Sequence, residues 1–323
     1  MPNGYLVATL GIVNKEELFL MMIWIIFTVF VLMMLTLDLM LAGKNDRAVT
    51  FKEAAIWSVI WVLCAFCFNG VIYYFQGREA AFQFLAAYLI EKSLSVDNLF
   101  VFLLIFKYFN VDPRYLRRVL FLGIFGALVL RAIFIIAGLA LVSRFHWVIY
   151  LFGGFLILTG IKMAFQKDKA LEPEKNPVIK FFKYFFPVSD AYDGGKFFIK
   201  QGSRLVATPL FIVLLLVETT DVIFAVDSIP AVFSITLDPF IAYTSNVFAI
   251  LGLRSLFFLL AGMMDKFHFL SAGLSVILVL IGTKMLISDL YHIPISVTLS
   301  ALVVILTLSI VMSILRPKKL NEA

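Results

Sequence analysis

Long apolar segments alternate with short polar connections along almost the whole chain. Several of these segments reach roughly 20 residues or more, the length that an α-helix needs to cross a bilayer. The pattern predicts nine membrane-spanning helices, at residues 18–41, 54–75, 80–106, 118–142, 147–165, 206–236, 241–262, 270–288 and 293–315. The first segment is too long for the apolar region of a signal peptide, and no small-residue cleavage site follows it. We therefore expect an all-α polytopic membrane protein.

Short motifs that contain charged residues recur in the two halves of the chain. The matching pairs are VDN at 96–98 with VDS at 226–228, LRAIF at 130–134 with LRSLF at 253–257, and GIKM at 160–163 with GTKM at 282–285. The first pair also places Glu91 on Asp221. Spans 3–5 thus repeat as spans 6–8, and because the unit contains three helices, the second copy must be inverted. Inverted repeats underlie many secondary transporters, whose substrate sites lie between the repeats near the middle of the membrane.

The spans and the repeat predict five regions of the chain. These are residues 1–79 with spans 1 and 2, 80–165 with the first repeat, 166–205 as a Lys-rich linker, 206–288 with the second repeat, and 289–323 with the last span and a tail. Lysines alternate with aromatic residues at 179–186 within the linker. This alternation fits either a short surface helix of a solvated linker or a helix that lies on anionic lipid.

Composition and charge agree with a membrane protein. The chain is 62% hydrophobic and 15% charged, with a mean hydropathy of +1.01, whereas globular chains are about a quarter charged. The net charge of +6 does not indicate nucleic acid, since 20 of the 27 Lys and Arg residues lie on one side of the predicted membrane and four on the other. The positive-inside rule makes the basic side cytoplasmic. It predicts an N-terminus outside and a C-terminus in the cytoplasm.

The spans contain more acidic than basic residues. The acidic residues in spans or at their edges are Asp38, Glu91, Asp97, Glu218, Asp221 and Asp227, and the basic residues within spans are Lys92, Arg131 and Arg254. An unpaired charge at the centre of a membrane helix costs about 2.5–3.5 kcal/mol on the insertion scale. If Arg131 and Arg254 each bind one carboxylate and Lys92 binds another, three anions remain. A divalent cation or protons would neutralise them.

Helix geometry predicts how some of these groups meet. Glu218 and Asp221 are three residues apart and lie on one helix face, whereas Asp221 and Asp227 point about 240° apart in an unbroken helix. For both aspartates to face one ion, the helix must unwind nearby. Pro230 supplies a reason for a helix break, because it cannot donate a hydrogen bond to the carbonyl of Val226. An ordinary membrane-helix kink at Pro230 is the alternative.

The other candidate ligands are oxygen donors as well. Asn98 and Asn246 offer amide oxygens, although interhelical hydrogen bonding is the alternative for such residues. Oxygen-only sites suit Mg, Ca or Mn, whereas Zn and Cu favour imidazole or thiolate, and this chemistry does not choose among the first three. Cys64 and Cys67 lie together in span 2. Helix packing, a soft metal site and a redox pair are the alternatives for them.

Four stretches around the charged residues resemble the TerC family, close to its Alx branch. They are EKSLSVDNLFVF (91–102), LVETTDVIFAVDSIPAVF (216–233), NVFAILGLRSLFF (246–258) and GTKMLISDLYHIP (282–294). The resemblance implies a bacterial inner-membrane protein of the LysE-like transporter type, linked to manganese efflux and to tellurium resistance. It maps the acidic motif residues of the family onto Glu91, Asp97, Glu218, Asp221 and Asp227, with Asp38 from the first span.

We therefore expect a secondary transporter, not an enzyme, that exports Mn(II) from a bacterial cytoplasm, with Mg or Ca as second choices. Exporting a dication against an inside-negative potential costs about 4.6 kcal/mol per 100 mV. No nucleotide-binding motif is visible, so exchange for protons is the simplest coupling, and no permanent cofactor is expected. The expected partners are the metal ion and the lipid bilayer, without nucleic acid. A membrane-embedded redox or stress-response protein, or a scaffold without transport activity, is the alternative.

Overall fold

The computed structural model describes residues 15–43, 50–165, 177–189, 191–201, 204–261, 269–291 and 293–315. The chain divides into two compact units, residues 1–46 and 47–323. Helix α1 (Lys15–Gly43) is the described part of the first unit, and it coincides with the first predicted span. The side chain of Asp38 lies outside the described residues.

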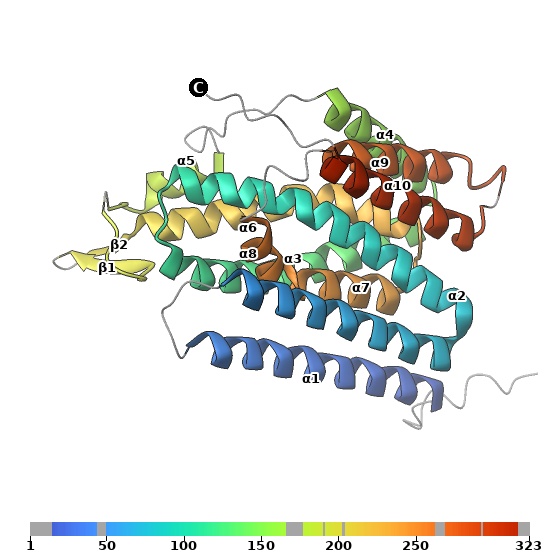
Figure 1. Cartoon of the computed structure of the whole chain (residues 1–323), viewed down its shortest axis with the longest axis horizontal. Coiled ribbons are helices and arrows are strands. Elements are labelled where there is room, and N and C mark those ends of the chain that lie inside the picture. Colours follow the sequence, from blue (N-terminus) through green and yellow to red (C-terminus); the bar gives the residue numbers. More distant parts are fainter. Residues whose placement is uncertain are drawn as a thin grey trace, which may run out of the picture. The chain divides into compact units, whose positions relative to one another are not determined.

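Helix α2 (Phe51–Tyr108) consists of two helices joined at a single glycine. Gly77 has φ +88° and ψ −178°, a combination that is essentially restricted to glycine. Figure 1 shows the result: the chain runs along the bundle, turns at one end and runs back. The predicted spans at 54–75 and 80–106 are both helical, and the turn falls in the gap predicted between them.

The second unit continues with eight more described helices and one β-hairpin. In chain order these elements are α3 (Pro113–Arg144), α4 (Val148–Phe165), α5 (Pro177–Phe185), β1 (Phe198–Gln201), β2 (Arg204–Ala207), α6 (Pro209–Phe233), α7 (Pro239–Leu251), α8 (Leu253–Ala261), α9 (Leu270–Leu286) and α10 (Ile295–Leu315). Six helical segments of the described chain are long and apolar enough to cross a membrane, α7 and α8 counting as one, and α9 and the centre of α1 are shorter apolar helices. A nearly all-helical, polytopic membrane protein is thus confirmed, with a described helix in each predicted span and two helices, α7 and α8, in the seventh.

The short helix predicted at 179–186 of the linker is present as α5, and the hairpin of β1 and β2 is an addition that no sequence pattern predicts. Ile179 of α5 is buried, and Phe182 packs on Phe211 of α6 with ring centroids 5.0 Å apart, so α5 is held on the bundle. Strands β1 and β2 pair antiparallel. Because β2 takes up residues 204–207, α6 has 25 residues instead of the roughly thirty expected for the sixth span.

Helices α4 and α9 pack so closely that their backbones nearly touch. A Cβ atom on Gly282 would lie 2.6 Å from the carbonyl oxygen of Gly153, and a Cβ atom on Gly160 would lie 2.8 Å from that of Ser275. Close approach through small residues is the common packing mode of membrane helices. The contacts on α9 fall from 282 to 275 as those on α4 rise from 153 to 160, so the two helices are antiparallel. In Figure 1 α9 also lies beside α10.

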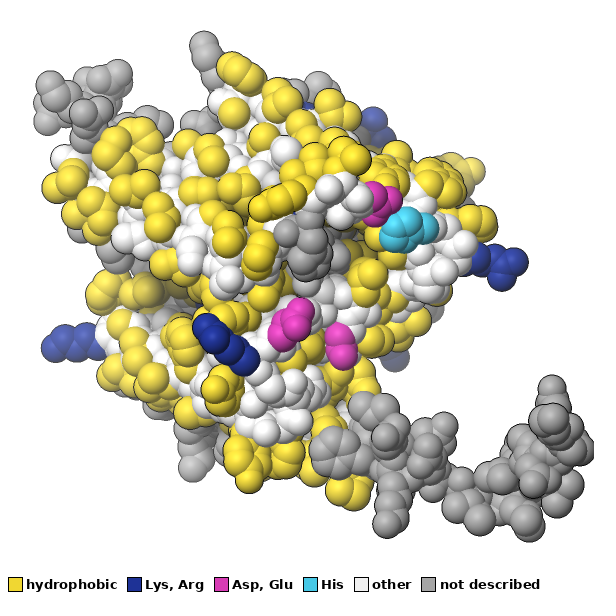
Figure 2. Space-filling view, turned by 90° about the vertical axis from the view of Figure 1, so that its right-hand side faces the viewer, with side chains coloured by type: hydrophobic (Ala, Val, Ile, Leu, Met, Phe, Trp, Pro, Cys, Tyr) yellow, Lys and Arg dark blue, Asp and Glu magenta, His cyan; other side chains and the backbone are white. Residues whose placement is uncertain are grey.

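The outer surface is mostly apolar. Large side chains such as Ile136, Leu158 and Ile223 expose more than half of their area. Figure 2, which faces one end of the bundle, shows hydrophobic side chains with only a few charged ones between them. In water such a surface would be unfavourable, whereas lipid covers it at no cost.

Candidate functional site

A buried ion cluster joins three helices in the interior of the second unit. Arg131 of α3 is 1% exposed, and its Nη1 donates to Glu91 of α2 and, at 2.9 Å, to Ser228 of α6. Its Nη2 lies 3.4 Å from Asp221 of α6. Glu91 and Asp221 are 0% and 4% exposed. One guanidinium therefore holds two carboxylates that are far apart in the sequence.

The hydrogen bonds of this cluster are incomplete. Oε2 of Glu91, Oδ2 of Asp221 and Nε of Arg131 are buried and have no hydrogen-bond partner. Each such group carries a desolvation cost of about 1–3 kcal/mol, more when it is charged. The cluster also contains two carboxylates and one guanidinium, an excess of one negative charge. Its free acceptor oxygens and its charge both suit a cation.

Glu218 lies one turn before Asp221 on α6 and is half-buried. Its carboxyl group rests directly on Gly126 of α3, where a Cβ atom would collide with both of its oxygens. The lack of a side chain at Gly126 therefore leaves the space that this carboxylate occupies. No sequence pattern marks Gly126, because a glycine in a membrane span carries no signal of what it will face.

Asp97 and Asp227 lie apart from the ion cluster and contact different helices. Ser271 in the first turn of α9 donates to Asp97 of α2 at 2.9 Å. Thr159 of α4 donates to Asp227 of α6 at 3.2 Å. Both aspartates are half-buried. No sequence pattern marks these two hydroxyl partners either, since a serine and a threonine are common in membrane spans.

The structure thus brings only part of the predicted site together. Glu91 and Asp221 meet at Arg131, whereas Asp97 and Asp227 contact α9 and α4. Among the described residues no three His, Cys, Asp or Glu side chains lie close enough to hold a metal ion between them. The expectation that one arginine pins one carboxylate is corrected, because Arg131 contacts two. Arg254, for which a similar pairing was predicted, is half-buried at the start of α8.

The predicted helix break at Pro230 is wrong. Helix α6 continues through Pro230 to Phe233, and Ser234 N–H donates to the carbonyl of Pro230 at 3.1 Å. Proline removes a single backbone donor, and so close to the end of the helix the lost bond does not unwind it. Asp221 and Asp227 consequently keep the divergent directions of an unbroken helix.

The seventh span is the one that is interrupted, at Gly252 between α7 and α8. Nζ of Lys92 donates to the carbonyl of Ala249 in the last turn of α7 at 3.1 Å. A cation at a helix C-terminus is favoured by the partial negative charge of the unpaired carbonyls. A Cβ atom on Gly252 would lie 2.6 Å from this ammonium group. Lys92 therefore binds the broken end of α7, not a carboxylate as the charge count assumed.

Both predicted amides are buried. Asn98 is 5% exposed, and Asn246 of α7 is fully buried with neither amide atom hydrogen-bonded. An unpaired buried amide is costly. Asn246 thus stays a candidate oxygen ligand.

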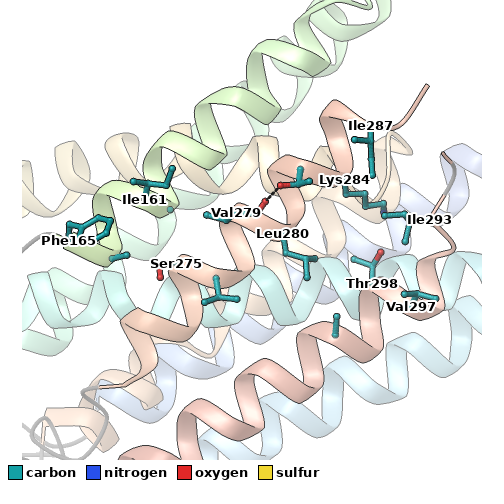
Figure 3. A pocket seen from close by; sticks show the side chains of 15 residues that line it. Ile161, Phe165, Ser275, Val279, Leu280, Lys284, Ile287, Ile293, Val297 and Thr298 are labelled. Carbon is teal, nitrogen blue, oxygen red and sulfur yellow. Dashed lines mark hydrogen bonds between the residues drawn. The ribbon is translucent and has the colours of Figure 1, made fainter. Parts of the chain in front are cut away.

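A groove of about 540 Å³ lies elsewhere, between α4, α9 and α10, and its residues are shown in Figure 3. The side chains around it are almost all apolar, such as Ile161, Leu280 and Val297. Lys284 at its edge donates to the carbonyl of Ser234 at 3.1 Å. None of the predicted carboxylates lines this groove.

The profile described as "Integral membrane protein TerC family" matches residues 76–321. The chain belongs to the TerC family. It is 49% identical to the "Uncharacterized membrane protein STKORF319" of Myxococcus xanthus, over 92% of this chain and 93% of that protein. It is 47% identical to the "Putative membrane-bound redox modulator Alx" of Salmonella typhi and of Escherichia coli K12, in each case over 90% of this chain and 94% of the relative. No solved structure matches this TerC chain.

Proposed function

We propose that this TerC-family chain exports a divalent cation, Mn(II) before Mg or Ca, from the cytoplasm across a bacterial inner membrane in exchange for protons. The observation that carries the proposal is the buried cluster of Glu91, Asp221 and Arg131, which holds two carboxylates against one guanidinium. A buried excess negative charge with unpaired acceptor oxygens is costly unless a cation visits it. The family resemblance supplies the choice of Mn(II).

The proposal includes an inverted repeat of spans 3–5 and 6–8. The packing of α4 on α9 supports it, since the offset of 122 makes Gly160 equivalent to Gly282 and Gly153 equivalent to Ser275. The observed contacts are Gly153 with Gly282 and Gly160 with Ser275. If every position is replaced by its equivalent in the other repeat, the first contact becomes the second. Reciprocal contacts of this kind are the mark of a two-fold axis.

The aspartates extend this relation into a route. Asp97 lies six residues beyond Glu91, toward the end of α2, and Asp227 lies six residues beyond Asp221, toward the end of α6. Each step is about 9 Å along a helix. The ends of α2 and α6 are at opposite faces of the membrane in the proposed topology. The cation would therefore meet Asp97 first, then the central cluster, and then Asp227.

Transport by purified protein tests the proposal. The full chain in proteoliposomes with an imposed pH gradient should move Mn(II), and Mg, Ca and Zn in parallel assays would rank the ions. Empty liposomes give the background. If none of the four ions crosses faster than background in either gradient direction, the protein is not the proposed carrier.

Gly126→Ala is expected to lower Mn(II) transport about tenfold while changing the free energy of unfolding by less than about 1 kcal/mol. The added methyl group displaces the carboxylate of Glu218, which is the mobile end of its side chain. Misplacing a metal-binding group typically costs 10–100-fold in affinity or activity. Gly154→Ala is the matched control, because nothing lies within 4 Å of its added Cβ. Equal transport by the two variants would show that Glu218 takes no part in binding the transported ion.

The Alx relatives are named as membrane-bound redox modulators, and this name raises a redox role as a second candidate. This chain has two cysteines, Cys64 and Cys67, both free on α2, and Cys67 is exposed on the apolar surface. We expect the double variant Cys64→Ser, Cys67→Ser to transport Mn(II) at the wild-type rate, because neither thiol belongs to the carboxylate route. Transport that is lost in a correctly folded double variant would favour the redox role.

A further inference from the structure

The guanidinium of Arg131 lies between two carboxylates that belong to different helices and to equivalent positions of the proposed repeat. Nη1 contacts Glu91 on α2, and Nη2 contacts Asp221 on α6. Arg131 is 1% exposed, so water does not screen these contacts. The arginine thus spans the interface at which an inverted-repeat carrier places its substrate.

A transported dication would need the same two carboxylates. If it bound beside the guanidinium, three positive charges would face two negative ones in a site that excludes water, where like charges repel strongly. Arginine cannot relieve this by losing its proton, because it stays charged in proteins. One of the two cations must therefore leave when the other binds.

We infer that Arg131 is a built-in cation that competes with the transported dication for Glu91 and Asp221; this rests on the proposed function. Arrival of the metal displaces the guanidinium, and return of the guanidinium expels the metal. Ser228, a neutral acceptor 2.9 Å from Nη1, gives the guanidinium a hydrogen-bond partner other than the two carboxylates. The unpaired Oε2 and Oδ2 atoms of the two carboxylates leave room for a cation to begin binding before Arg131 withdraws.

If Arg131 competes with the metal, its removal should strengthen Mn(II) binding, whereas removal of a purely structural arginine should weaken it. Removing the charge in Arg131→Gln should tighten Mn(II) binding by about tenfold or more, since the competitor is gone. The same variant should lose transport at least about tenfold, because the metal is no longer expelled. A purely structural arginine would instead lose binding and transport together.

The experiment measures Mn(II) affinity by calorimetry and Mn(II)-dependent thermal unfolding on the full chain in detergent, with transport in proteoliposomes. Without metal, Arg131→Gln should unfold at a lower temperature than wild type, and Mn(II) should raise its unfolding temperature more than that of wild type. Arg118→Gln is the control, because Arg118 donates to the carbonyl of Gly195 at an exposed position. It should leave affinity and transport unchanged.

Arg131→Lys decides the question if Arg131→Gln does not fold. Lysine keeps the charge but not the planar fork that reaches two carboxylates, so Mn(II) should bind more tightly than to wild type and be transported more slowly. Unchanged or weaker Mn(II) binding in correctly folded Arg131 variants overturns the competition, whether transport is kept or lost. Absence of both binding and transport in the wild type overturns the proposed function, and the competition with it.

Discussion

Replacing Asp97 or Asp227 by Asn is expected to reduce Mn(II) transport by at least about a hundredfold while leaving the protein folded. Asn has the shape of Asp and keeps an oxygen that accepts the hydroxyl of Ser271 or Thr159. It loses the negative charge that attracts a dication, and even indirect partners of metal ligands typically account for 10–100-fold in affinity or activity. Because both side chains are half-buried in the bundle, a neutral group there is no less stable than a charged one.

Radioactive Mn(II) flux in proteoliposomes measures the transport loss, and thermal unfolding in detergent checks the fold. Asp238→Asn is the matched control: Asp238 caps the N-terminus of α7 by accepting from the backbone of Phe240 and Ile241. Asn is as good an N-cap as Asp, so this variant should transport normally. Wild-type flux through Asp97→Asn and Asp227→Asn would show that the ion takes another route.

Gly282→Val is expected to destabilise the protein by about 3 kcal/mol or more, at the upper end of overpacking costs. Its Cβ atom would lie 2.6 Å from the carbonyl oxygen of Gly153 and 3.0 Å from the backbone nitrogen of Ile157. Those atoms belong to the backbone of α4, which cannot rotate away as a side chain would. Helices α4 and α9 must then separate, and the proposed repeat axis runs between them.

Denaturant-induced unfolding in mixed detergent micelles measures this loss. Gly154→Val is the control on the same pair of helices, since Gly154 has open space around its added Cβ. It should change the free energy of unfolding by less than about 1 kcal/mol, the scale of helix propensity. Equal stability of the two variants would contradict backbone-to-backbone packing of α4 and α9.

The helices themselves could be predicted from the chain, because lipid leaves so few choices. A backbone in hydrocarbon must satisfy its own hydrogen bonds, so each apolar segment of sufficient length becomes a helix. Even the turn between the second and third spans fell in the predicted gap, at Gly77. The hairpin at 198–207 escaped prediction, since a polar linker is under no such constraint.

The positions of helix breaks are harder to predict from the sequence than the helices themselves. Pro230 removes one hydrogen bond next to the end of α6 and leaves the helix intact. At Gly252, where no missing donor marks the sequence, the chain interrupts the seventh span, and Lys92 binds the end of α7. The partner that stabilises this break comes from 157 residues away.

The sequence by itself determined the membrane class, the helical segments and the excess of acidic residues within them, since these depend on the length, polarity and order of residues along one chain. Only the tertiary structure decided that Arg131 holds both Glu91 and Asp221. It also decided that Asp97 contacts a hydroxyl group on α9 and Asp227 one on α4. Which charges meet depends on the rotation and register of packed helices. Those are decided by close contacts such as Gly126 with Glu218 and Gly153 with Gly282, whose partners lie far apart in the sequence.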